Sequence, residues 1–424
     1  MSVLLALVLV AAGWSLTPRR PRPVLVALAL FFAAGVVVFH ALLALSSFCG
    51  LRWQIHLLAA LLMIAPLARL LRSPDVVTGA PGMPKWADVA SGAVLSWLAY
   101  LGWKLRNVTS DYTYDWGVKG EKFFLQRGID FRFLNQPWTI HPSYPTAVPE
   151  LYAASALLHR SFEAPEMMLW SALAVALAWA VYRDLVSEQR HGALLALGIA
   201  GAIAAACLQC FLFGGAEPFL FLSIALAARG MLVEDADSDF LVCVAAALAG
   251  AVKIEGLVLG ALILATHGLR RLPRLRQKRA TWARVLMLGA PYAAMAVLEV
   301  LLLRRVGGEP AFSPGLSGLS RLVGIPGLVL RECLRSHLGG LAFLPLAAPL
   351  LVCFRRTRSI GVVASLQIAF YLLVYAVAPA NPDDYIRTSF ARIASPFVPL
   401  VLASVMLLLQ SRGDETRART ASRF

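Results

Sequence analysis

The chain has 424 residues, of which 59% are hydrophobic and only 15% are charged. Its mean hydropathy is +0.71, whereas roughly a quarter of the residues of a soluble domain are charged. This composition excludes a soluble globular protein. The net charge of +15 does not indicate nucleic-acid binding, because most basic residues lie in short loops between apolar runs. Anionic lipid headgroups are the simpler partner for such loops.

Apolar runs recur along the whole chain and predict transmembrane helices. About 20 residues cross roughly 30 Å of hydrocarbon, and only a helix satisfies its own backbone there. We therefore predict an all-α, polytopic integral membrane protein with about 13 transmembrane helices. The expected spans are 2–17, 24–47, 54–71, 87–105, 166–183, 192–213, 217–233, 240–252, 254–268, 285–303, 338–354, 359–379 and 394–410.

The loop 269–284 sets the expected orientation. Its seven Lys or Arg residues are typical of a cytoplasmic loop. Counting spans from it places the N-terminus outside and the C-terminus inside. The longest outer loops, 106–165 and 304–337, contain amphipathic pieces expected to lie on the membrane surface. Because Ala, Leu and Arg usage is typical of a GC-rich bacterial genome, we expect a bacterial cytoplasmic (inner) membrane, with the site on the periplasmic face.

The first large outer loop is dense in aromatic and charged residues. Carboxylates, a lysine and aromatic rings at a membrane surface suggest chemistry performed there. Taken singly, each ring is more typical of an interfacial aromatic belt, and His141 is equally typical of a buried hydrogen-bonding histidine. The residues that stand out are Asp111, Tyr114, Asp115, Trp116, Lys119, His141 and Tyr144.

Charged residues also lie at the ends of later spans. Glu217 precedes Pro218 at an outer boundary, and Lys253-Ile-Glu255-Gly lies between two apolar runs. Ionisable groups at such depths are costly unless they are paired or hydrated, which makes them site candidates. A Lys253–Glu255 pair that merely snorkels to the surface is the alternative. Arg387 and Arg392 lie on the outer side, where positive charge is unexpected, and either an anionic ligand or lipid headgroups would explain them.

Four elements, in this order, resemble the GT-C superfamily of glycosyltransferases, in particular bacterial proteins related to dolichyl-phosphate-mannose protein mannosyltransferases. They are Asp111-x4-Trp116-x2-Lys119, His141-Pro-Ser143-Tyr144-Pro145, Gly214-Gly-Ala-Glu217-Pro and Lys253-Ile-Glu255-Gly. The resemblance covers roughly 88–270 and fades in the C-terminal third. Ser143 stands where the family often has an acidic residue, so no carboxylate role is carried to that position.

The resemblance implies a GT-C-like fold and divides the chain into four parts. These are N-terminal extra helices (1–86), a catalytic core (87–268) that contains the outer loop 106–165, C-terminal helices (269–410) that contain the loop 304–337, and a basic cytoplasmic tail (411–424). The implied activity is transfer of a sugar from a polyprenyl-phosphate donor to an acceptor hydroxyl on a lipid, a glycan or a protein.

Such a transfer assigns roles to the residues. The acceptor hydroxyl needs a general base, for which Asp111 is the first candidate and Asp115 the second. Negative charge on the leaving phosphate needs cations, in falling order of motif support Lys119, Lys253, Arg387 and Arg392. The candidates for binding the substrate are Tyr114, Trp116, His141, Tyr144, Glu217 and Glu255. A single base implies direct displacement with inversion. No metal site is assigned, and a divalent cation held by the two aspartates stays open.

A transporter or flippase for a lipid-linked or anionic substrate is the alternative function. Transporters often contain two repeated halves with broken helices at matching positions. The sequence contains no convincing internal repeat, and its polar residues concentrate in one early outer loop, which favours the enzyme. A structural assembly subunit, the third class, would not need the cluster from Asp111 to Lys119.

Overall fold

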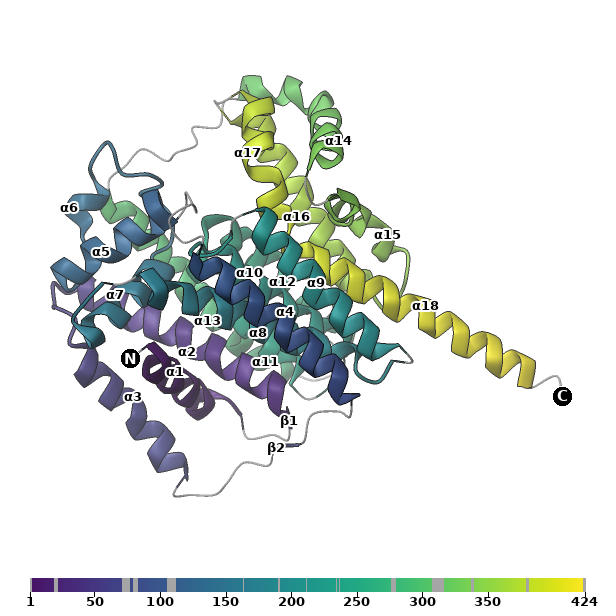
Figure 1. The fold of residues 1–424 in the computed structure, drawn as a ribbon, viewed down its shortest axis with the longest axis horizontal. Coiled ribbons are helices and arrows are strands. Elements are labelled where there is room, and N and C mark those ends of the chain that lie inside the picture. The colour runs from purple at the N-terminus through teal and green to yellow at the C-terminus, as the bar shows by residue number, and fades with distance from the viewer. Residues whose placement is uncertain are drawn as a thin grey trace.

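The structure is a computed structural model of the chain. It describes residues 2–18, 22–70, 77–78, 83–104, 112–162, 164–189, 191–210, 212–233, 235, 237–275, 280–306, 316–336, 339–378 and 381–421. The predicted all-α class is confirmed, since helices make up nearly all of the regular structure in these residues. Figure 1 shows the long helices running alongside one another, with α5, α6 and α7 at one end of the bundle and the strand pair β1–β2 toward the other.

The helices of the first half of the chain are α1 (Ser2–Leu16), α2 (Val24–Phe48), α3 (Ile55–Leu70), α4 (Lys85–Lys104), the π-helix η1 (Tyr112–Trp116), α5 (Gly117–Gln126), α6 (Phe131–Leu134), α7 (Ala147–His159), α8 (Ala164–Val186) and α9 (Gly192–Gln209). Those of the second half are α10 (Glu217–Leu232), α11 (Ser238–Val252), α12 (Ile254–Leu275), α13 (Ala280–Val306), η2 (Leu316–Val323), α14 (Ile325–Arg335), η3 (Gly339–Phe343), η4 (Pro345–Ala347), α15 (Ala348–Val352), α16 (Arg358–Val377), α17 (Pro382–Ala394) and α18 (Phe397–Ala421). Two short strands, β1 (Arg22–Pro23) and β2 (Val77–Thr78), pair in parallel.

Each predicted span coincides with helical residues, but the predicted number of spans is not confirmed. Among the described residues three helices, Val24–Phe48, Met168–Val186 and Arg358–Val377, are long and apolar enough to cross a membrane. The pair Pro382–Ala394 and Phe397–Leu409, bent by 51°, would add a fourth if it forms one span. Several others are short: the 15 residues of α1 reach only about 22 Å, against roughly 30 Å of hydrocarbon.

The surface of α3 supports a membrane environment. Leu57, Leu61 and Ile64 are all more than half exposed on this helix. A row of exposed large apolar side chains is unfavourable in water and suits contact with lipid.

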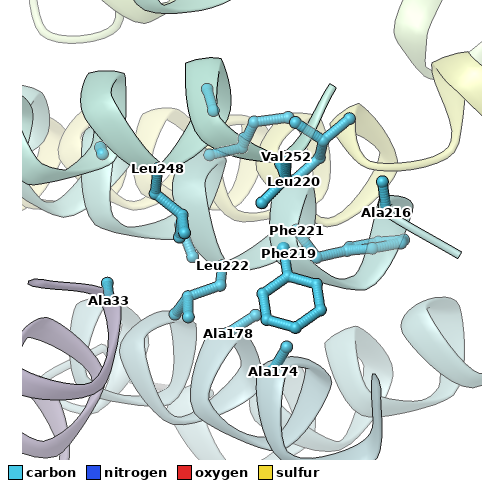
Figure 2. Packing of buried hydrophobic residues seen from close by; sticks show 14 of the residues in the cluster. Ala33, Ala174, Ala178, Ala216, Phe219, Leu220, Phe221, Leu222, Leu248 and Val252 are labelled. Atoms are coloured by element: carbon cyan, nitrogen blue, oxygen red, sulfur yellow. The ribbon is translucent and has the colours of Figure 1, made fainter. Parts of the chain in front are cut away.

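The hydrophobic core surrounds α10, in which every residue from Glu217 to Leu232 is buried. A helix that is apolar all round belongs at the centre of a bundle. Figure 2 shows Phe219 and Leu222 of α10 facing Ala174 and Ala178 of α8, with Leu248 and Val252 of α11 on another side. Alanines on the neighbouring helices let the backbones approach closely, the usual device for helix packing inside membranes.

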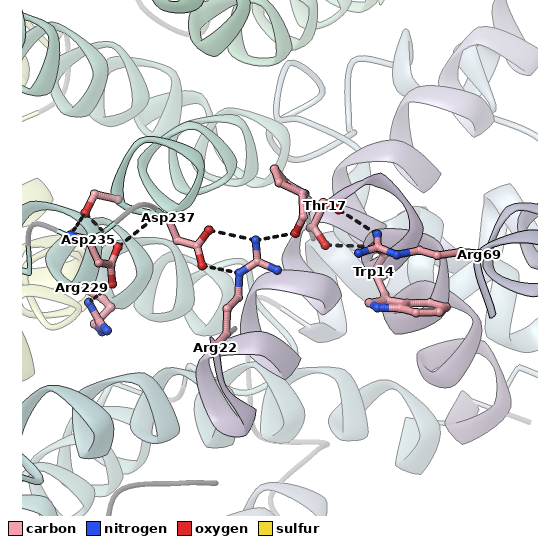
Figure 3. Close-up of polar contacts among 9 residues, drawn as sticks. Trp14, Thr17, Arg22, Arg69, Arg229, Asp235 and Asp237 are labelled. Atoms are coloured by element: carbon pink, nitrogen blue, oxygen red, sulfur yellow. Dashed lines mark hydrogen bonds and ion pairs between the residues drawn. The ribbon is translucent and has the colours of Figure 1, made fainter. Parts of the chain in front are cut away.

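The end of the bundle expected to face the cytoplasm is closed by ion pairs (Figure 3). Arg22, at the start of α2, donates to both carboxylate oxygens of Asp237, at 2.5 and 3.0 Å. Arg229 of α10 binds Asp184 of α8 and Asp235, each at 2.9 Å. These contacts join the α1–α2 turn, the end of α8 and the α10–α11 turn, and they leave the opposite end as the place for a site.

Candidate functional site

The first part of the site is an ion pair in the outer loop. Asp115 is the residue before the last in the π-helix η1, and Lys119 follows one turn later in α5, so that their side chains share one helix face. The Lys119 Nζ lies 2.6 Å from Asp115 Oδ1, and both residues are buried. A buried ion pair costs desolvation that its mutual attraction only partly offsets, so its presence inside an outer loop suggests a function beyond stability.

The second part is the turn at His141-Pro-Ser143-Tyr144-Pro145, which packs directly on the first. The Lys119 ammonium donates to the His141 carbonyl oxygen at 2.7 Å. The rings of His141 and Tyr144 are stacked with centroids 4.5 Å apart, and Trp116 lies 5.8 Å from Tyr144. His141 has a positive φ of 45°, a conformation that most L-residues avoid and that a constrained turn has to maintain. The two predicted loop motifs thus form one unit.

The third part is built at the ends of three helices of the bundle, α10, α11 and α12. Glu217 is the first residue of α10, where the positive end of the helix dipole favours a carboxylate. Lys253 lies at the break between α11 and α12, with extended backbone angles of −155° and 146°. Its Nζ donates to Glu217 Oε1 at 2.8 Å, and Arg392 of α17 approaches the same oxygen at 3.4 Å.

Two glycines allow these turns to form. Gly214 has a φ of 82°, and a Cβ at this position would lie 2.7 Å from Cβ of Tyr112. At Gly256 a Cβ would lie 1.9 Å from the carbonyl oxygen of Ala249, so α11 and α12 can meet only where no side chain is present. The Gly-Gly-Ala-Glu and Lys-Ile-Glu-Gly elements therefore carry their glycines for backbone reasons.

The three parts meet around the turn of His141. Its partial burial, and then the nearby cations Lys119, Arg392 and Lys253, lower the pKa of His141 to about 4. The loop pair and the helix-end cluster are also adjacent at Gly215, where a Cβ would lie 2.7 Å from Glu217 Oε2 and 3.8 Å from Nε1 of Trp116. Residues far apart in the sequence thus place three cations at one location. We call Asp115, Lys119, His141, Tyr144, Glu217, Lys253, Glu255 and Arg392 the outer cluster.

Glu255 also lies near Tyr144 of the His141 turn. Burial of Tyr144, with the Glu255 carboxylate nearby, raises the pKa of the tyrosine well above its ordinary value. Gln367 of α16 donates to the Glu255 carbonyl oxygen at 3.2 Å. The carboxylate oxygen Oε2 is buried and has no hydrogen-bond partner among the described residues, so it is an unsatisfied acceptor inside the cluster.

Other predicted site residues lie apart from the outer cluster. Arg387 is 65% exposed and contacts Asp384 at 3.4 Å on α17, while Tyr114 is 66% exposed. Trp116 and Tyr144 are buried among protein side chains, so these two rings do not form an interfacial belt. Asp111, the first candidate for the general base, lies outside the described residues.

Three ionisable residues were missed by the sequence analysis. His40 of α2 contacts Glu150 of α7 at 2.8 Å and Glu299 of α13 at 2.7 Å, and all three are buried. His40 and Glu299 each stand inside an apolar run, and a single ionisable residue in such a run was the available signal.

The described part of the chain contains no group of three or more His, Cys, Asp or Glu side chains that could hold a metal ion. A divalent cation held by Asp111 and Asp115 stays a prediction, because Asp111 is not among the described residues. Chemically, the cations of the outer cluster can bind an anion.

Comparison with known proteins does not assign a family. No protein-family profile matches the chain, and a search of curated proteins found no match.

Proposed function

We propose that this protein is a membrane glycosyltransferase that moves a sugar from a polyprenyl-phosphate donor to an acceptor hydroxyl at the periplasmic face of the bacterial inner membrane. The observation that carries the proposal is the convergence of Lys119, Lys253 and Arg392 around the His141 turn. These residues come from the loop 106–165, a helix break and α17, and they bring together three cations that a lipid phosphate can contact in exchange for their carboxylate partners.

The cations supply what the leaving group needs. Glycosyl transfer leaves the negative charge of the broken bond on the phosphate, and preorganised cations stabilise it without moving. Lys253 and Arg392 both face Glu217, which holds them in place before the phosphate arrives. Lys119 is held in the same way by Asp115.

The general base is then assigned to Asp111. Asp115 is engaged at 2.6 Å by Lys119, so its role in this proposal is to position the ammonium. Asp111 precedes η1 by one residue and belongs to the same motif, which keeps it the first candidate. Direct attack by the activated hydroxyl on the anomeric carbon, with the polyprenyl phosphate leaving from the opposite face, inverts the configuration.

Transfer from a panel of polyprenyl-phosphate monosaccharides, measured with the purified protein in lipid nanodiscs, tests the proposal. We expect Asp111→Asn to lower turnover at least roughly a hundredfold, the usual contribution of a general base. Arg392→Gln should lower kcat/KM for the donor by roughly tenfold or more, since one charge-assisted contact is lost.

Lys122→Met is the matched control. Lys122 lies in α5 three positions after Lys119, and its ammonium lies 5.9 Å from the centre of the Phe133 ring. The Lys122→Met variant should transfer sugar at the rate of the wild type. Unchanged turnover in Asp111→Asn would reject the base assignment. Absence of transfer from every donor, together with passage of lipid-linked sugar across the bilayer of proteoliposomes, would favour a flippase instead.

A further inference from the structure

A buried relay of polar side chains connects the N-terminal helices to the His141 turn. His40 of α2 lies between two carboxylates: its Nδ1 contacts Glu150 Oε2 at 2.8 Å and its Nε2 contacts Glu299 Oε1 at 2.7 Å. The other oxygen of Glu150 accepts from the Thr146 hydroxyl at 2.7 Å. Thr146 is the N-cap of α7 and stands two residues after Tyr144 of the outer cluster.

The relay is costly where it lies. His40, Glu150 and Glu299 are each at most 2% exposed, inside a predominantly apolar bundle. Removing two carboxylates from water carries a desolvation penalty of several kcal/mol per ion, and apolar side chains would join the helices without it. Polar groups fix the relative orientation of the helices, because a hydrogen bond sets a distance and an angle between two atoms. Apolar contacts allow the helices to slide along each other.

The contacts also determine how many protons the relay holds. An ionised carboxylate only accepts, so each of the two ring contacts needs a proton between nitrogen and oxygen. The imidazole and the two carboxyl groups therefore hold at least two protons between them. Substituting Gln for Glu299 preserves this pattern, because its amide donates to Nε2 while Nδ1–H still donates to Glu150. Leu at position 299 cannot make the contact.

The relay ends at the turn that forms the outer cluster. The Glu150 N–H donates to the Thr146 carbonyl oxygen at 2.9 Å, and the Tyr144 N–H donates to that of His141 at 3.0 Å. A narrow slot between α13 and this turn is lined by Glu299, Thr146 and Tyr144, which places both ends of the relay beside the turn.

We infer that His40 is a positioning residue, which holds the turn 141–146 in register with the outer cluster through Glu150 and Thr146. This gives the N-terminal helices, which contain no other feature that indicates catalysis, a part in the site. The ring of His40 contacts Glu150 and Glu299, so its effect on the outer cluster passes through α7.

Amide hydrogen exchange of the full chain in nanodiscs tests the inference without any sugar transfer. Peptides covering 141–150 should exchange roughly tenfold faster in His40→Gln and Glu299→Leu, because a buried acceptor loses its donor. Glu299→Gln should exchange at the wild-type rate. Thr146→Val leaves His40 and both carboxylates in place and should also accelerate exchange, which keeps the inference testable if the His40 variant does not fold.

Ser155→Ala is the control. Ser155 is buried on the same helix and accepts from Trp170 Nε1 at 2.9 Å, but it is outside the relay. Wild-type rates over 141–150 in this variant, with fast exchange in the others, support the inference. Equal acceleration in Ser155→Ala, wild-type exchange in Thr146→Val, or a Glu299→Gln variant as fast as Glu299→Leu would overturn it.

A transfer assay forms a second arm, and only this arm rests on the proposed function. Thr146→Val should lower kcat/KM for the donor, whereas Ser155→Ala should leave it unchanged. If the wild type transfers no sugar, the proposed function fails, while the exchange arm still decides the role of His40.

Discussion

Lys253 and Glu217 form a pair that is nearly sealed from solvent, with side-chain exposures of 2% and 1%. A charge at such depth is tolerated because its partner lies at 2.8 Å, and removing either partner leaves the other uncompensated. Arg392, 3.4 Å from Glu217, offsets part of that imbalance. The pair therefore links the stability of the bundle to the charge of the site.

Lys253→Met is expected to lower the free energy of unfolding by about 3–5 kcal/mol, the usual result of breaking a buried ion pair on one side. The double variant Lys253→Met/Glu217→Gln should recover part of the loss, because neither charge is then left alone. Denaturant unfolding in detergent micelles measures both. A double variant less stable than the sum of the two single losses would contradict the pairing.

His141 gives the site a defined response to acid. Its pKa is about 4 in the folded chain against 6.5 ordinarily, so the unfolded chain binds more protons between these values. Stability contributed by the neutral imidazole is therefore present above pH 6.5 and is lost as the pH falls toward 4. His141→Asn should remove this part of the pH dependence of the unfolding midpoint. Identical pH profiles for His141→Asn and the wild type would reject the assignment.

Single residues also show what the sequence could predict of the site. Asp115 and Lys119 were predicted as members of one motif, and the structure pairs them because residues four apart share one face of a helix. Arg387 was ranked before Arg392, whereas Arg392 is the one that lies beside Glu217. Motif order could not reveal this, because five helical positions differ by about 140° and the orientation of α17 depends on packing. His40 was missed because one histidine does not change the average of an apolar window.

The α11–α12 hairpin is the element that carries Lys253 and Glu255. Its two helices meet at Gly256, whose N–H donates to the Lys253 carbonyl oxygen at 2.9 Å. The predicted spans 240–252 and 254–268 place this break at the correct residue. The predicted span 338–354 falls on two 3₁₀ turns and the short α15, and its apolar helical part, Leu341–Val352, has fewer than 18 residues. Apolar composition alone cannot distinguish these cases.

Gly256→Ala should disrupt this hairpin, since the added Cβ would lie 1.9 Å from the Ala249 carbonyl oxygen, far inside contact distance. Gly268→Ala on the same helix meets nothing within 4 Å and should be neutral or slightly stabilising, because Ala is the better helix former. We expect a lower melting temperature and weaker donor binding in the first variant alone. Similar melting of both variants would show that α11 and α12 can separate at little cost.

At the scale of the whole molecule, the two ends of the bundle carry charge in different ways. At the end that includes Arg22 and Arg229, guanidinium groups are matched with carboxylates of neighbouring turns. At the other end Glu217 is shared between Lys253 and Arg392. Separate pairs suit a structural seam. Cations that share one carboxylate, as Lys253 and Arg392 share Glu217, can instead exchange that contact for an anion.

Which end of the bundle faces the periplasm depends on the orientation of the chain in the membrane. Two cysteines can report that orientation. Cys49 and Cys353 are both exposed. Cys49 follows α2, whose first residues lie at the end expected inside, so it should face the periplasm. Cys353 is followed by Arg355, Arg356 and Arg358. Because cytoplasmic loops carry an excess of Lys and Arg, we expect this segment in the cytoplasm.

A membrane-impermeant maleimide applied to intact spheroplasts should therefore label the wild type through Cys49, and Cys49→Ser should abolish this labelling. Cys353 should react only after permeabilisation, and Cys353→Ser is the matched control for that second signal. Labelling of Cys353 in sealed spheroplasts would place the outer cluster on the cytoplasmic side. Lys119, Lys253 and Arg392 would then face soluble anions of the cytoplasm, and a donor delivered from the periplasmic leaflet would no longer reach them.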